Sequence, residues 1–299
     1  MKRIYTLGLL LCIAITMLGQ QRVDKLIDDL NNPNSKRVLV VAHRGDWRNA
    51  PENSLQAFQN CIDMGVDMIE LDLHMSKDSV LFLIHDNTLN RTTNGHGKVS
   101  DYTAAQLKQL RLRAGHGAVT RHQIPTFEEA LILCKGKILI NVDKGYEYFK
   151  EAYRLMEKTG TTRQVVIKSG HPADKVLSEN GDVISKVIYM PIINININAN
   201  DAESRINEYA KIRPAAIECC FNKADDNAVK LLQLVQKNGS KVWINSLWPS
   251  LCGGHDDDRA VEENQPEEAW GWIIEHGATL IQTDRPAQLI HYLKHNHRH

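Results

Sequence analysis

Short apolar stretches rich in valine and isoleucine recur along the chain, and longer stretches with the spacing of amphipathic helices separate most of them. This alternation is typical of a fold in which helices cover a buried parallel sheet. We therefore predict strands at residues 38–43, 68–74, 80–85, 137–142, 165–168, 186–190, 215–218, 241–245 and 279–283. The predicted helices include residues 54–64, 126–134, 146–158, 201–211, 225–237 and 267–276.

The connection between the second and third predicted strands is exceptional because it contains only residues 76–79. A parallel crossover needs about a dozen residues or more, so these two strands are predicted to form an antiparallel hairpin. A turn centred between Lys77 and Asp78 places His85 opposite Glu70. The other strands fit the α/β class, as a (β/α)8 TIM barrel of about 250 residues. An open doubly wound sheet is disfavoured because no G-x-G-x-x-G loop follows the first strand.

The chain is predicted to contain one barrel domain preceded by a secretory signal peptide. Lys2 and Arg3 come before an apolar run over residues 4–18, which is too short for a comfortable membrane span. We assign residues 1–19 to the signal peptide and 20–299 to the barrel, with an insertion over residues 87–123 that carries a helix at 103–112. A buried first helix is the alternative interpretation of the apolar run. The mature protein is expected to be periplasmic or secreted, without a stable membrane anchor.

The composition excludes several classes of protein. The 36 lysines and arginines balance the 36 aspartates and glutamates, so no net charge attracts nucleic acid. A hydrophobic share of 42% and a charged share of 24% exclude fibrous and multi-span membrane proteins. The cysteines after the predicted signal peptide are odd in number and irregularly spaced, which excludes a disulfide framework. The expected partner is a small molecule, and the oligomeric state is left open.

The first predicted strand ends in His43 and Arg44, at the end of the barrel where active sites of this fold lie. A guanidinium beside an imidazole can bind a phosphate or an oxyanion. A lone histidine at a strand end is more often structural, so the pair gains meaning only together with its neighbours.

Carboxylates follow on the next strands. Glu70 and Asp72 are two residues apart in an apolar strand, so both project from the same face. Two buried negative charges need a counter-charge, which salt bridges or a divalent cation can supply. Asp143 ends the fourth strand with the same parity as Asn141 and can complete a metal site. Oxygen ligands favour Mg²⁺ or Ca²⁺ over zinc.

Two histidines flank this acidic cluster, because the hairpin register brings His85 level with Glu70 and Asp72. Imidazole titrates near neutral pH, so one ring can hold a proton while the other accepts one. The pattern does not assign which of His43 and His85 is the acid. A serine nucleophile is less supported because no G-x-S-x-G motif occurs.

Other residues at strand ends are candidates for binding the substrate. Lys168 ends an apolar fifth strand and needs an anionic partner or ligand. Lys144 should face away from the pocket, towards the helices, unless the strand bulges. Trp243, on the eighth strand, has either a wall or a packing role. Glu52 and Asn53 lie in the loop after the first strand, with Asn53 as a helix N-cap, and are expected beside the metal ligands without binding the ion.

Taken together and in order, the motifs AHRGD, APENS, ELDLHMSKDSV, HDNTLNRTT, IPTFEEAL and QTDRP strongly resemble the glycerophosphodiester phosphodiesterase family. The resemblance spans residues 38–286. It implies a phospholipase-C-like barrel that hydrolyses a phosphodiester. It further implies that His43 and His85 are the catalytic acid–base pair and that Glu70 and Asp72 bind a divalent metal ion.

The fourth strand departs from the family, in which it commonly contains Glu-x-Lys. Here the residues are Asn141, Val142, Asp143, Lys144 and Gly145, so Asp143 replaces the glutamate and a glycine occupies the lysine position. Either Lys144, through a bulge, or Lys168, from the neighbouring strand, can supply the cation that faces the phosphate.

The sequence favours a metal-dependent phosphodiesterase that cleaves glycerophosphodiesters to glycerol 3-phosphate and an alcohol. A second hypothesis is a non-catalytic protein that binds a phosphorylated headgroup, although the presence of both histidines and both carboxylates argues against it. A third is a related enzyme that acts on another lipid or sugar phosphodiester. The leaving alcohol and the choice between Mg²⁺ and Ca²⁺ are left open.

Overall fold

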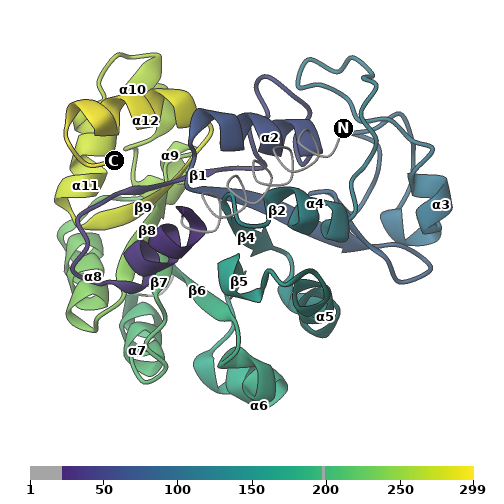
Figure 1. Cartoon of the computed structure of the whole chain (residues 1–299). Helices are drawn as coiled ribbons and strands as arrows, with labels where there is room; N and C mark the ends of the chain where they lie inside the picture. The colour runs from purple at the N-terminus through teal and green to yellow at the C-terminus, as the bar shows by residue number, and fades with distance from the viewer. Residues whose placement is uncertain (1–21, 197–198) are drawn as a thin grey trace, which may run out of the picture.

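The strands close into a barrel in the computed structural model, which describes residues 22–196 and 199–299 (Figure 1). The parallel ring runs β1, β9, β8, β7, β6, β5, β4 and β2, and it closes through a pairing of β1 with β2. The TIM-barrel prediction is therefore confirmed. The strands are β1 Leu39–Ala42, β2 Met68–Met75, β3 Leu81–Leu83, β4 Leu139–Asp143, β5 Val165–Ser169, β6 Ile188–Asn194, β7 Ala216–Cys220, β8 Lys241–Asn245 and β9 Ala278–Thr283. The predicted signal peptide, residues 1–19, lies outside the described residues.

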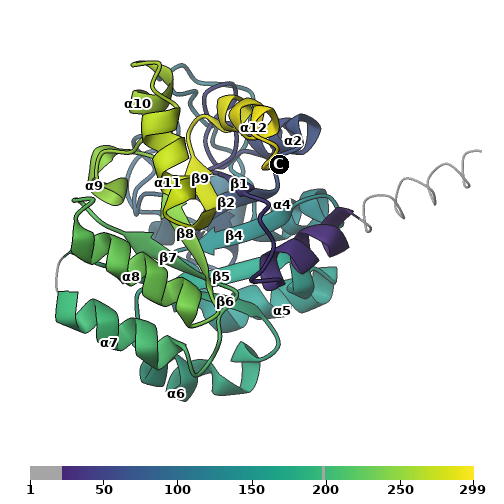
Figure 2. The same ribbon diagram turned by 90° about the vertical axis from the view of Figure 1, so that its left-hand side faces the viewer.

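Helices surround the strands (Figures 1 and 2). They are α2 Leu55–Met64, α3 Ala104–Leu107, α4 Phe127–Cys134, α5 Phe149–Thr159, α6 Ala173–Ile184, α7 Ala199–Tyr209, α8 Asp226–Lys237, α9 Pro249–Cys252, α10 Asp257–Val261, α11 Trp272–Glu275 and α12 Pro286–His295. A π-helical segment, Glu267–Gly271, precedes α11, and a helix over residues 22–31 precedes β1. None of the helices in the described ranges is both long and apolar enough to cross a membrane.

The side chains inside the barrel form an apolar layer and a polar layer. The apolar layer comes from the amino-terminal parts of the strands, and the helix over residues 22–31 packs against it; its members include Leu39, Val41, Met68, Leu139, Val166, Met190, Ala216, Trp243 and Leu280. Two residues further along six of the strands, the next inward positions are polar and buried: Glu70, Asn141, Lys168, Glu218, Asn245 and Gln282. Polar chemistry is thus concentrated towards the carboxyl ends of the strands, where barrel active sites lie.

Trp243 belongs to the apolar layer, which corrects the prediction that it contacts substrate. Its side chain is fully buried, and its indole Nε1 donates to Asn245 Oδ1 at 2.7 Å. The Lys168 ammonium lies 5.8 Å from the centre of the indole ring. Trp243 is two residues before Asn245 on β8 and points to the same inward face, so the ring fills the barrel beneath the polar layer instead of forming a pocket wall.

The predicted hairpin of β2 and β3 is present, but its register differs by one residue from the prediction. Leu73 pairs with Leu83, and β3 ends there, so His85 does not pair with Glu70. The physical reason is a three-residue turn closed by Ser76 and Val80, whose last residue, Ser79, has a left-handed φ of 63°. A turn of this length moves the centre of the hairpin onto its middle residue.

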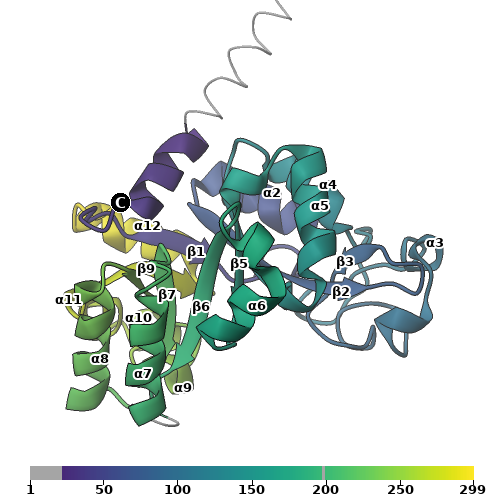
Figure 3. The same cartoon turned by 90° about the horizontal axis from the view of Figure 1, so that it is seen from below.

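The insertion after β3 lies beside the barrel (Figure 3). It packs around a small apolar cluster. Only part of the predicted helix at 103–112 is helical, as the single turn α3. Leu107 is buried and Leu110 partly so, as their spacing predicts. The helix ends early because the chain beyond it runs alongside the first half of the insertion, where Leu112 bridges to Thr93.

Candidate active site

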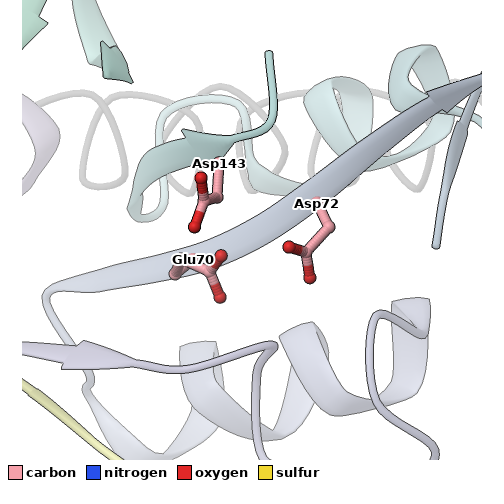
Figure 4. A group of neighbouring side chains, drawn as sticks. All are labelled: Glu70, Asp72 and Asp143. Carbon is pink, nitrogen blue, oxygen red and sulfur yellow. The ribbon is translucent and has the colours of Figure 1, made fainter. Parts of the chain in front are cut away.

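Three carboxylates meet at the carboxyl ends of β2 and β4 (Figure 4). Asp72 is in register with Asp143, and Glu70 lies two residues before Asp72 on the same face of β2. One oxygen from each carboxylate lies within 4.8 Å of the others. Both Glu70 and Asp72 are only 1% exposed. The strand register therefore brings the three predicted metal ligands together.

The cluster contains more negative charge than its protein neighbours balance. Lys168 Nζ lies 3.5 Å from Asp143 Oδ2 and 2.9 Å from Glu218 Oε2. Burial opposes the charged form of Lys168, but these carboxylates and Glu70 outweigh it and hold the pKa of Lys168 above its ordinary value. Burial, followed by the nearby Asp72, raises the pKa of Glu70 well above the ordinary value. A further cation would relieve this repulsion.

The donors around the cluster fit a hard divalent ion. All three candidate ligands offer oxygen, which suits Mg²⁺ or Ca²⁺. Asn141, in register with Glu70, is buried, and neither of its amide atoms has a hydrogen-bond partner within the described residues. This polar surface beside the carboxylates is compatible with the water molecules that both ions usually retain. Glu70, Asp72 and Asp143 can therefore hold the ion.

The loop after β1 holds two of these carboxylates from the opposite side. The backbone N–H of Arg44 donates to Glu70 Oε2 at 2.9 Å, and the Asn53 amide donates to Asp72 Oδ2 at 2.9 Å. The α2 helix begins after Ser54, whose side chain accepts from the Ala57 N–H, so Ser54 and not Asn53 is the N-cap. Asn53 is instead left-handed, with φ 57°, and buried against Asp72.

Arg44 reaches this position because the chain turns sharply after β1. Arg44 and Gly45 have φ values of 54° and 77°. A Cβ on Gly45 would lie 2.9 Å from atoms of both Ala57 and Phe58, so only glycine fits against α2. The turn places Arg44 Nη1 3.1 Å from Glu52 and Arg44 Nε 3.5 Å from Asp72. The guanidinium therefore lies between the carboxylate cluster and the pocket.

His43 is oriented by an aspartate from the last strand end. Its Nδ1 lies 2.8 Å from Asp284 Oδ1, which also accepts from Trp47 Nε1 at 2.6 Å. Burial raises the pKa of Asp284, but the hydrogen bond from His43 and the Trp47 indole outweigh it, so the net pKa lies below the ordinary value. The ring of Trp248 contacts His43 edge-on, with ring centres 6.1 Å apart. Asp284 thus leaves Nε2 of His43 for the pocket.

A second buried aspartate holds Asp284 in place. Asp257 accepts from the Asp284 N–H at 2.6 Å, from Thr283 Oγ1 at 2.8 Å, from Ser246 Oγ at 2.6 Å and from Trp270 Nε1 at 2.9 Å. Burial raises the pKa of Asp257 to about 6, against the effect of these four hydrogen bonds. Asp257 was not found by sequence reasoning, because it lies in an acidic run without a strand-end signal.

His85 lies in the loop after β3. Its Nδ1 is 2.7 Å from Asp86 Oδ1, so the two histidines have matching aspartate partners. Arg91 donates to both Asp86 and Glu52, and Glu52 also binds Arg44. This chain of ion pairs connects the loops that carry the two histidines, even though the predicted hairpin pairing of His85 is wrong.

Lys144 does not face the helices as predicted. Its φ is 54°, which ends β4 and turns the side chain so that Nζ donates to the carbonyl oxygen of His85. The alternation of faces no longer applies at such a residue. Lys144 and Lys168 therefore both lie near the acidic cluster, one at its rim and one buried beneath it.

A cavity of 630 Å³ opens beside these residues. Its walls include His43, Arg44, Glu52 and Asp284 from the barrel, with Trp47 and Trp248. The insertion contributes Arg91, Thr92 and residues 113–117. Sequence reasoning missed Arg91, Arg113 and Trp248, and it included Asp284 only as part of the QTDRP motif.

Comparison with known proteins finds sequence relatives and solved structures that are named as phosphodiesterases. The glycerophosphodiester phosphodiesterase of Caldanaerobacter subterraneus subsp. tengcongensis is 42% identical over 109 residues, which cover 36% of this chain and 45% of that relative. The crystal structure of a glycerophosphoryl diester phosphodiesterase from Parabacteroides distasonis is 27% identical, has a TM-score of 0.75 and covers 92% of each chain. An Oleispira antarctica phosphodiesterase, solved in complex with the product sn-glycerol-3-phosphate, is similar in fold, with 18% identity, a TM-score of 0.64 and coverage of 86% of this chain and 97% of that one.

The sequence matches are shorter than the structural ones. The matched part of the chain spans less than half the length of this relative and of a second one, from Bacillus subtilis. A family model described as a domain of unknown function matches residues 189–293, from β6 to α12. The barrel as a whole is thus similar to the solved structures, while the identity to the curated sequences is concentrated in part of it.

Proposed function

Because the chain is a homologue of the glycerophosphodiester phosphodiesterase family, we propose that it hydrolyses glycerophosphodiesters to glycerol 3-phosphate and an alcohol. The observation that carries the proposal is the convergence of one histidine–arginine pair and three carboxylates at the carboxyl ends of the barrel strands. His43, Arg44, Glu70 and Asp72 belong to motifs of that family. His43 and Arg44 line a cavity large enough for a small diester, and Arg44 also contacts Glu70 and Asp72.

Each group at the site has a separate role in the proposed reaction. Arg44 binds the phosphoryl oxygens, since its guanidinium points from the carboxylate cluster towards the cavity. His43 and His85 exchange protons through Nε2, because each Nδ1 is held by an aspartate. A Mg²⁺ or Ca²⁺ ion bound by Glu70, Asp72 and Asp143 supplies positive charge for the phosphoryl group.

A substrate panel tests the proposal. The purified chain is incubated with glycerophosphocholine, glycerophosphoethanolamine and glycerophosphoinositol in the presence of Mg²⁺ or Ca²⁺, and glycerol 3-phosphate is measured. Release from at least one diester is expected. Tight calorimetric binding with no product over hours would instead favour a non-catalytic headgroup-binding protein. Turnover only of other lipid or sugar phosphodiesters would show a related enzyme.

The metal site has its own prediction, in which Asp72→Asn weakens binding of the ion. The substitution removes one of three ligand charges, so we expect Mg²⁺ or Ca²⁺ affinity to fall by about tenfold or more. Calorimetric titration of the chelator-treated protein measures this directly. Asp63→Asn, on the exposed side of α2, is the matched control and should not change affinity. Unchanged affinity of the Asp72 variant would contradict the assignment, as would full activity in excess chelator.

We further propose that the mature protein is exported. The support is the sequence itself, in which Lys2 and Arg3 precede an apolar run over residues 4–18. Expression of the full chain with cell fractionation and amino-terminal sequencing tests this. Loss of about the first 19 residues from exported protein is expected. An uncleaved amino terminus in the cytoplasmic fraction would contradict it.

A further inference from the structure

The wall of the cavity that comes from the insertion contains a cation without a carboxylate partner. Arg113 Nε donates to the carbonyl of Thr93 at 2.7 Å, and its Nη1 donates to the carbonyl of Gly117 at 2.9 Å. Among the described residues no carboxylate lies within ion-pair distance of this guanidinium. Two neutral carbonyls orient the group but leave its charge uncompensated.

The other charged groups of the cavity are already paired. Glu52 accepts from Arg44 and from Arg91, which also binds Asp86. Asp284 accepts from His43 and Trp47. Of the three arginines in the cavity wall, Arg113 is therefore the one without a carboxylate partner among the described residues.

A short hairpin fixes Arg113 at this place. Arg113 bridges to Val119, the Ala114 N–H donates to Ala118 at 2.9 Å, and the Gly117 N–H donates back to Ala114 at 2.8 Å. The turn passes over the indole of Trp47, whose carbon atoms would lie 3.5 Å from a Cβ on Gly115. The guanidinium is thus held on a defined loop and is half-buried.

The cavity is poorly suited to a cationic headgroup. A quaternary ammonium is usually bound by open aromatic faces. Here Gly115 packs against the Trp47 ring, and the guanidinium of Arg48 lies 4.6 Å from its centre. Trp248, 43% exposed, still offers its ring, but the unpaired guanidinium of Arg113 in the same cavity would repel a second cation.

We propose that Arg113 binds a negatively charged group on the leaving alcohol, so that the preferred substrates are glycerophosphodiesters whose alcohol is itself anionic. This inference rests on the proposed phosphodiesterase function and names its substrate class. The glycerol half of such a diester carries no charge, and the reacting phosphate lies at Arg44, so an anion at Arg113 belongs to the leaving alcohol. Charge-assisted hydrogen bonds to a guanidinium are among the stronger polar contacts.

The experiment compares three diesters that release the same glycerol 3-phosphate. Glycerophosphocholine has a cationic alcohol, glycerophosphoglycerol a neutral one, and glycerophosphoinositol 4-phosphate an anionic one. The wild-type chain is expected to have the highest kcat/KM on the anionic diester. Arg113→Met should lower that value by about tenfold or more and leave the neutral diester within about twofold. Arg111→Met, a matched change in the same insertion at a guanidinium bound only to backbone carbonyls, should alter none of the three.

Other outcomes overturn the inference. An equal loss on all three diesters would show that Arg113 only supports the loop. A wild-type preference for glycerophosphocholine would show that the subsite does not select an anionic alcohol. Calorimetry with myo-inositol 4-phosphate separates this inference from the proposed function, since binding does not need turnover. Wild-type binding that Arg113→Met abolishes would support the subsite even if no diester were hydrolysed, and no binding by the wild type would contradict it.

Discussion

Single residues in this barrel gain their roles from the partners that other loops provide. His43 and His85 each hold an aspartate through Nδ1, although one lies after β1 and the other after β3. Neither aspartate is close to both rings, so each histidine is oriented independently. Such an arrangement suits an acid–base pair whose two members carry a proton at different stages.

The histidine pair predicts a bell-shaped dependence of kcat/KM on pH, because one ring must be neutral while the other is protonated. His43→Ala and His85→Ala should each lower kcat by on the order of 10²-fold or more and remove one limb of the profile. Steady-state kinetics between pH 5 and 9 on the best substrate measure this. His96→Ala, an exposed histidine of the insertion, is the control. A variant of either histidine that keeps both limbs would exclude it as an acid or base.

The two lysines near the carboxylates predict different losses. Lys168→Met removes the buried cation between Asp143 and Glu218 and should raise KM or lower kcat by at least about tenfold. Lys144→Met should do less, because Lys144 lies at the rim and binds a backbone carbonyl. Kinetics are measured well below the melting temperature of each variant, so that folding losses are separated. The reverse order of effects would assign the phosphate-facing role to Lys144.

At the scale of elements, short turns decide where the strand-end side chains point. The β1–α2 loop contains three left-handed residues, Arg44, Gly45 and Asn53, and these direct Arg44 and Asn53 towards the carboxylates of β2. The β4 end has a single left-handed residue, Lys144, which redirects its side chain to the β3 loop. Each turn breaks the strand periodicity at the point where the chemistry begins.

Asn53 tests the contribution of one such turn. Asn53→Ala removes the contacts to Asp72. It also places alanine, which tolerates a left-handed backbone less well than asparagine, at φ 57°. We therefore expect the free energy of unfolding to fall by about 3 kcal/mol. Asn53→Gly loses the same contacts without the backbone strain and should fall by about 2 kcal/mol. Urea denaturation measures both. Equal losses would show that the left-handed backbone costs nothing here.

At the scale of the whole molecule, the two ends of the barrel have separate tasks. The carboxyl ends of the strands carry the cavity, while a buried ion-pair network lies near the amino ends. There Asp67 binds Arg37 at 2.6 Å, His299 at 2.9 Å and the Val40 N–H at 2.9 Å. This joins the segment before β1, the start of β2 and the carboxyl-terminal segment. Residues at this end of a barrel usually serve stability.

Asp67 predicts a pH-dependent stability. Burial raises its pKa, but His299, Arg37 and the Val40 N–H outweigh burial, so the folded pKa lies below the ordinary value of 3.8. A lowered folded pKa stabilises the fold above the unfolded pKa, and this contribution is lost as the pH falls through the folded pKa. Asp67→Asn should therefore lower the free energy of unfolding by about 3 kcal/mol at pH 7, and the difference from wild type should shrink below about pH 4.

Urea denaturation of wild type and Asp67→Asn at pH 7, 5 and 3.5 checks this prediction. Asp63→Asn, a surface change on α2, controls for loss of an aspartate. A difference that stays constant down to pH 3.5 would contradict the role of Asp67. Substrate turnover at pH 7 should be unchanged at temperatures where the variant is folded, because Asp67 lies at the opposite end from the cavity.

The sequence by itself determined the barrel, because its strands are buried on both faces and its helices on one, and these burial patterns leave different periods in the chain. All nine strands were predicted, and strand parity alone predicted that Glu70, Asp72 and Asp143 share a face. Local propensity also placed helices such as α2, α4 and α8 within a few residues of their observed bounds, whereas α6 and α12 were not predicted.

Only the tertiary structure decided where side chains lie outside the regular strands, because the alternation of faces does not apply there. The three-residue turn shifted the β2–β3 register, the left-handed Lys144 reversed its expected direction, and the packing of the barrel interior enclosed Trp243 in the apolar layer. Asp257 and Arg113 acquired their positions from contacts between segments far apart in the chain. Periodicity specifies a side chain's face only within a regular element, so turns, bulges and long insertions take their geometry from the packing around them.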